Sequence, residues 1–114
     1  QYFSFNATAN TQVVTGVSGR KIYICSFFAQ MNGGANTVSV VSGTGSVCAT
    51  STAAVTGMDG STTAANGFSF TANSGITLGG GGFPIAATTV NADNLCVFVG
   101  SATRVVAGGS FALI

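Results

Sequence analysis

Hydrophobic and polar residues alternate along several short segments of the chain. In residues 1–7, Phe3 and Phe5 fall on one face of an extended strand, and Tyr2 and Ser4 fall on the other. A period of two residues is typical of a strand with one buried face. Further segments of strand-like composition, bounded by Gly, Ser, Asn and Thr, lie at residues 12–17, 20–31, 37–42, 67–71, 88–90, 94–100 and 104–114. The pattern therefore predicts about eight strands and no helix.

The longest of these segments contains the stretch KIYICSFFAQM, which carries bulky side chains on both faces. A strand of this kind is expected in the centre of a sheet, where both of its faces are covered. Asn32-Gly33-Gly34 follows it and predicts a hairpin turn into the strand at 37–42. We expect the aromatic side chains of the core to be Tyr23, Phe27, Phe28, Phe98 and Phe111.

Short strands with a turn signal every 8–12 residues predict an all-β fold, an antiparallel jelly-roll-like β-sandwich. Residues 1–114 are expected to form one domain, because single domains typically contain about 100–150 residues. Within it, residues 1–10 form an N-terminal arm or an edge strand, and residues 55–82 form long loops with one or two short strands. A silk-like or solenoid stack is the main alternative, but the chain contains no repeat of fixed period.

Charged residues are nearly absent. Three basic and two acidic residues give a net charge of +1, whereas 46% of the residues are hydrophobic. This composition excludes disorder and leaves no basic stripe for nucleic acid. The most apolar run, residues 22–31, is about half as long as the ~20 residues of a membrane-spanning helix, so no membrane partner is expected. Because nearly neutral proteins tend to associate, we expect other copies or a partner to cover much of the surface.

Candidate catalytic and ligand-binding residues are few. The chain has no His, so a serine or cysteine nucleophile would lack its usual base. The glycine run 79–82 has no Lys after it, which a phosphate-binding loop requires. Asp59 and Asp93, the only side-chain carboxylates, are expected in turns. Calcium binding by one of these carboxylates together with loop carbonyls stays an alternative. We expect no enzymatic activity, no cofactor and no metal site.

The three cysteines allow three single pairings. Cys25 lies within the longest predicted strand, Cys48 in a loop rich in Ser, Thr and Gly, and Cys96 at the beginning of a late strand. Because a loop can move to meet a strand end, we favour a Cys48–Cys96 disulfide with Cys25 free. Three reduced thiols, as in a cytosol, are the alternative. The chain begins with Gln1 rather than Met, and we expect it to be a processed or renumbered product.

Several stretches resemble small virion proteins of tailed phages. They are TQVV at 11–14, VSGRKIYI at 17–24, GTGSVC at 43–48, AVTG at 54–57, NLCV at 94–97 and TRVVAGG at 103–109. The family comprises capsid decoration (cement) proteins and small β-domains of tails and fibres, typically jelly-roll-like and often trimeric. The resemblance implies a homotrimer on the virion surface that contacts the major capsid protein or other virion subunits. It also implies a disulfide between Cys48 and Cys96.

The leading functional hypothesis is a capsid decoration protein that stabilises the shell by self-association and by contacts to neighbouring subunits. Tyr2, Phe3 and Phe5 would form its assembly arm, because the N-terminal stretch departs from the resemblance and looks suited to docking. One alternative is a subunit of an extracellular filament or pilus, assembled by addition of the N-terminal strand to a neighbouring sheet. A second is a tail-associated module that binds a receptor or glycan, although the chain has no Trp and only two Tyr.

Overall fold

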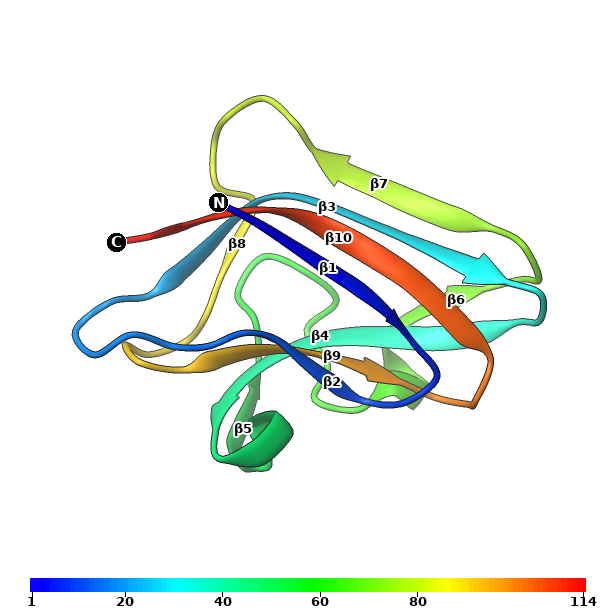
Figure 1. The fold of residues 1–114 in the computed structure, drawn as a ribbon, viewed down its shortest axis with the longest axis horizontal. Coiled ribbons are helices and arrows are strands. Elements are labelled where there is room, and N and C mark those ends of the chain that lie inside the picture. The colour runs from blue at the N-terminus through cyan, green and yellow to red at the C-terminus, as the bar shows by residue number, and fades with distance from the viewer.

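The computed structural model describes all residues, 1–114, as two antiparallel β-sheets packed together, without an α-helix (Figure 1). Sheet A contains, in spatial order, β1 (Tyr2–Ala7), β10 (Arg104–Leu113), β3 (Ile22–Asn32) and β7 (Gly75–Gly79), and β8 (Ala86–Ala87) also pairs with β3. Sheet B contains β2 (Thr11–Val14), β9 (Asn94–Val99), β4 (Asn36–Thr44) and β5 (Thr50–Ala54), and β6 (Phe68–Phe70) also pairs with β4. Two single 3-10 turns, η1 (Ser46–Cys48) and η2 (Ala64–Asn66), lie between strands. No helix in the structure could cross a membrane.

The main core lies between the two sheets and explains the alternation in the sequence. Sheet A supplies Phe3 and Phe5 from β1 and Phe27 from β3, and sheet B supplies Val40 and Val97. Phe3 is near both Phe27 and Phe111, with ring centroids 6.5 and 6.3 Å apart. The predicted β-sandwich is therefore confirmed, and β3 lies in the interior of its sheet between β10 and β7, as its bulky faces indicated.

The predicted hairpin after β3 is wrong. β3 pairs with β10, β7 and β8 in sheet A, whereas β4 pairs with β9, β5 and β6 in sheet B. The turn at 33–35 therefore carries the chain from one sheet to the other. Asn36 directs this crossing, because its buried side-chain amide donates hydrogen bonds to the carbonyls of Ser101 and Thr103 in the β9–β10 turn, at 3.2 and 3.0 Å.

Two other expectations need correction. The strand expected at 88–90 lies at Ala86–Ala87, and the buried Thr88 follows it, where its hydroxyl accepts a hydrogen bond from the Ile22 N–H at 3.1 Å. Of the expected core aromatics, Phe27 and Phe111 are buried, whereas Tyr23 and Phe98 are half-buried. Phe28 is 44% exposed, because it points away from the core on the outer side of sheet A.

Candidate functional site

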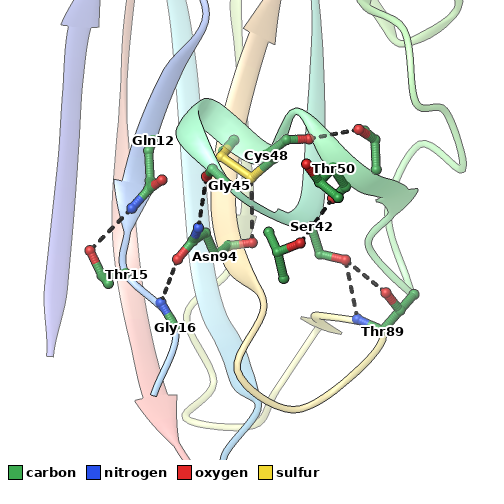
Figure 2. The surroundings of a disulfide bond; sticks show 12 residues. Gln12, Thr15, Gly16, Ser42, Gly45, Cys48, Thr50, Thr89 and Asn94 are labelled. Atoms are coloured by element: carbon green, nitrogen blue, oxygen red, sulfur yellow. Dashed lines mark hydrogen bonds between the residues drawn. A yellow bond between two sulfur atoms is a disulfide. The ribbon is translucent and has the colours of Figure 1, made fainter. Parts of the chain in front are cut away.

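Cys48 and Cys96 form a disulfide on the outer side of sheet B (Figure 2). Their Cα atoms are 6.2 Å apart, and both side chains are fully buried. With Val41 and the half-buried Phe98, they form a small hydrophobic cluster separate from the main core. The pairing favoured from the sequence is thus confirmed, and Cys25 is the free cysteine, as expected.

The disulfide holds a strained turn against sheet B. Val47, Cys48 and Ser51 have φ angles of 52°, 55° and 52°, a left-handed conformation that is unfavourable for L-residues and most of all for a β-branched valine. Two hydrogen bonds support the turn: Thr52 Oγ1 donates to the Cys48 carbonyl at 2.6 Å, and Asn94 Nδ2 donates to the Gly45 carbonyl at 3.3 Å. The cross-link and these bonds together fix a conformation that this segment would not adopt alone.

Asn94 also connects the η1 turn to the β2–β3 loop, which contains Gly16 (Figure 2). Its Oδ1 atom accepts a hydrogen bond from the Gly16 N–H at 2.8 Å. Gly16 in turn lies against the backbone of Ala92, so closely that a Cβ atom at Gly16 would lie 2.1 Å from the Ala92 carbonyl oxygen. Three segments therefore meet at this end of the sandwich: the η1 turn, the β2–β3 loop and the start of β9.

The chain covers the outer side of sheet B with its own loops. Ser39 and Val41 alternate with the core residues of β4 and so point outwards, yet both are fully buried. The Ser39 hydroxyl donates a hydrogen bond to the Ser61 carbonyl at 2.7 Å, which attaches the 55–67 loop to the strand. The η1 turn with Cys48 covers the neighbouring part of the sheet.

The outer side of sheet A has no such cover, and we call it the bare face. Its members alternate with core residues along β1, β10, β3 and β7. They include Tyr2, Ser4, Asn6, Val106, Gly108, Ser110, Ser26, Phe28, Gln30, Gly75, Thr77 and Gly79. Tyr2 is 88% exposed and Phe28 is 44% exposed. The one charged side chain on these four strands is Arg104, at a corner, where it donates a hydrogen bond to Asn6 Oδ1 at 2.8 Å.

The structure corrects the assignment of an assembly arm to Tyr2, Phe3 and Phe5. Phe3 and Phe5 are 7% and 3% exposed and belong to the core of their own chain, because β1 pairs with β10 along residues 2–7. The N-terminal segment is therefore an edge strand of sheet A rather than an extended arm. Tyr2 is the one member of the three whose side chain is free to contact another molecule.

The two acids lie in loops and do not form part of a group of three or more potential metal ligands. Asp93 is buried, and its Oδ2 atom accepts a hydrogen bond from Thr89 Oγ1 at 3.2 Å, whereas its Oδ1 atom has no partner within the chain. Both carboxylate oxygens of Asp59 are likewise buried without a partner. The glycine run forms the end of β7 and an exposed loop before β8.

The surface has two hollows, of about 250 and 280 Å³, and neither is lined by a charged or nucleophilic group placed for catalysis. One, of about 250 Å³, lies beside the β3–β4 and β9–β10 turns and is lined in part by Asn36, Thr37 and Phe70. The Asn36 amide already makes its hydrogen bonds to the β9–β10 turn, including one that its Oδ1 atom accepts from the Ser101 N–H at 2.9 Å. The hollow therefore does not present this amide to a ligand.

The bare face was not identified from the sequence, although part of the signal is present. The polar positions of β1 alternate regularly with Phe3 and Phe5, but the bulky stretch in β3 conceals which of Phe27 and Phe28 points outwards. Comparison with known proteins adds no relative: no family model, no curated protein and no solved structure matches the chain.

Proposed function

We propose that this chain is a non-enzymatic structural protein of a virion surface, a capsid decoration protein that acts by assembly. The bare face carries the proposal. A surface formed by four strands exposes Tyr2 and Phe28 and carries a single charged side chain at one corner. The surfaces of soluble proteins normally carry interspersed charged residues. Exposed aromatic side chains on a surface this poor in charge favour a role in contacts with other molecules.

We also propose that the sandwich is a jelly roll, an architecture that recurs in viral capsid proteins. The strand orders support this assignment. They are β1-β10-β3-β7 in sheet A and β2-β9-β4-β5 in sheet B, so the first four strands alternate between the sheets. The late strands β9 and β10 then insert between the early ones, as they do when a long antiparallel ribbon is rolled up on itself.

The covered side of the molecule suits a particle that persists outside a cell. The Cys48–Cys96 disulfide closes a segment of 48 residues and is inaccessible to reductants in the folded state, since both side chains are fully buried. Disulfides form and persist in oxidising environments, which include virion surfaces. In this proposal the disulfide-bonded side faces solvent, and the bare face is where self-association or a capsid contact occurs.

Immunogold electron microscopy of particles from the source of the chain tests this function. An antibody raised against the purified chain is expected to label the shells of virions evenly. Labelling confined to tails would instead support a receptor- or glycan-binding module, and labelling along extracellular threads would support a filament subunit. Absence of label from virions would overturn the proposal.

A further inference from the structure

Resting on the proposed assembly function, we propose that the bare face binds the bare face of a second copy of this chain about a two-fold axis. Phe28 lies at the centre of this contact. The bare face is the outer side of sheet A. On the outer side of sheet B, by contrast, Ser39 and Val41 are fully buried under the chain's own loops. The same protection is absent from sheet A, so a cover for its exposed Tyr2 and Phe28 would come from another molecule.

Charge favours a second copy over a charged partner. The bare face offers a single ionic side chain, Arg104, and that side chain is already hydrogen-bonded to Asn6 of its own chain. A strongly acidic or basic partner would therefore lose hydration without gaining ion pairs in return. Two uncharged faces meet without that loss.

The strand register makes the face self-complementary. Across sheet A, Tyr2 pairs with Ser110, Ser110 with Ser26, and Ser26 with Gly79, so these four residues form one row. The next outward row is Ser4, Gly108, Phe28 and Thr77, and the third is Asn6, Val106, Gln30 and Gly75. In the first row Tyr2 and Gly79 lie at opposite ends, and in the third row Asn6 and Gly75 do so. In the second row Gly108 and Phe28 lie on opposite sides of the seam between β10 and β3.

A two-fold axis parallel to the strands along this seam places β1 of one copy over β7 of the other. Tyr2 then lies opposite Gly79 of the second copy, and Asn6 lies opposite Gly75. At these two points a large side chain meets a position without one, as self-complementary packing between identical patches favours. Elsewhere in the contact Ser4 meets Thr77, and Val106 meets Gln30. The match is best near the axis, because packed sheets are rotated by about 30° relative to each other.

The Phe28 ring lies where this axis passes. It leans from β3 over Gly108 of β10, so that a Cβ atom at Gly108 would lie 3.0 Å from Phe28 Cε1. In the pair, each ring lies over the glycine of its own copy, and the two rings are side by side across the axis. Aromatic rings prefer such offset arrangements, and a buried aromatic residue at the centre is the usual energetic hot spot of an interface.

The size of the face fits a weak, specific contact. Four strands spaced about 4.8 Å apart and paired over about six residues give a flat footprint of roughly 400 Å² per copy. The ends of β3 and β10 and the protruding side chains enlarge it, so two copies bury about 1,000 Å² in total, near the lower limit for specific interfaces. We therefore expect reversible dimers that dissociate on dilution.

Light scattering coupled to size-exclusion chromatography tests the contact over a roughly hundredfold range of protein concentration. The wild-type mass is expected to rise with concentration from 11.2 kDa towards about twice that value. Phe28→Glu places two carboxylates at the axis and should raise the dissociation constant at least about tenfold. Thr77→Glu, at an exposed position in the same row, should act in the same direction. Val90→Glu changes a 55% exposed side chain in the β8–β9 loop, away from the bare face, and should leave the dimer unchanged.

Circular dichroism confirms that each variant is folded, and Thr77→Glu provides the test if Phe28→Glu is not. A wild-type chain that remains at the mass of one copy overturns the proposal, and so does a dimer that Val90→Glu weakens as much as the two bare-face variants do. A trimer also overturns it, because the two-fold contact predicts a pair. The light-scattering and labelling experiments distinguish failure of the two-fold contact from failure of the proposed function. If virions are labelled but the purified chain is monomeric, only the two-fold contact is refuted. If the chain dimerises but virions are not labelled, only the virion role is refuted.

Discussion

Replacing Cys48 and Cys96 together by alanine removes the cross-link between the η1 turn and β9. The two residues are 48 positions apart in the sequence, and closing a loop of this length lowers the entropy of the unfolded chain by an amount equivalent to about 4 kcal/mol. Part of this is offset in the variant, because the turn in which Val47, Cys48 and Ser51 hold left-handed conformations can relax once the cross-link is removed. We therefore expect the free energy of unfolding to fall by about 2–4 kcal/mol. That is a large share of the roughly 5–15 kcal/mol that stabilises a typical domain.

Urea unfolding followed by circular dichroism measures this change. The double variant should unfold at a lower urea concentration, and its transition should be steeper, because its unfolded chain is less compact and exposes more surface. Cys25→Ala is the matched control: it removes a half-buried thiol without opening a loop and should change the free energy of unfolding by less than about 1 kcal/mol. A double variant as stable as wild type would refute the argument that the cross-link stabilises the fold.

Three further predictions concern single positions. Phe5→Ala should lower the free energy of unfolding by about 3–5 kcal/mol in the same assay, because Phe5 is buried in the core of its own chain. Tyr2→Ala should change this free energy by less than about 0.5 kcal/mol, because Tyr2 is exposed. Equal effects of the two variants would contradict the placement of β1. Gly16→Ala should sharply reduce the yield of folded protein or its melting temperature, because the new Cβ atom would collide with the backbone of Ala92. Gly81→Ala is the control and should be neutral, because the space around Gly81 is open. A tolerated Gly16→Ala would contradict the close approach of Gly16 to Ala92. Alkylation in denaturant without a reductant should add one label, on Cys25, as seen by mass spectrometry, and three labels would contradict the disulfide.

Alternation in the sequence was sufficient to predict the β-sandwich and the central strand, but not which side of that strand is buried. β3 contains a bulge at Cys25: Ser110 pairs with Ser26, and the next residue, Phe111, pairs with Ile24. The extra residue shifts the phase of the alternation, so Ile22 and Ile24 are followed in the core by Phe27 rather than by an even-numbered residue. Because such a bulge is fixed by pairing with a distant strand, the sequence around Phe27 and Phe28 does not reveal it.

The segment around Phe3 and Phe5 shows a second limit. Its alternation correctly indicates a strand with one buried face, but a pattern along one segment does not specify which molecule supplies the partner. Here the partner is β10 of the same chain, 100 residues or more away in sequence for most pairs. The hairpin after β3 failed for a similar reason, since the contacts of Asn36 that redirect the chain come from the β9–β10 turn.

The central claim is that another molecule covers the bare face in the functional assembly, and cryo-electron microscopy of the virion on which we propose that the chain lies tests it most directly. The map is expected to show Phe28 of sheet A buried against a second copy of the chain, with the loops over sheet B facing solvent. A map in which sheet A faces solvent, and the disulfide side makes the subunit contacts, would contradict the claim.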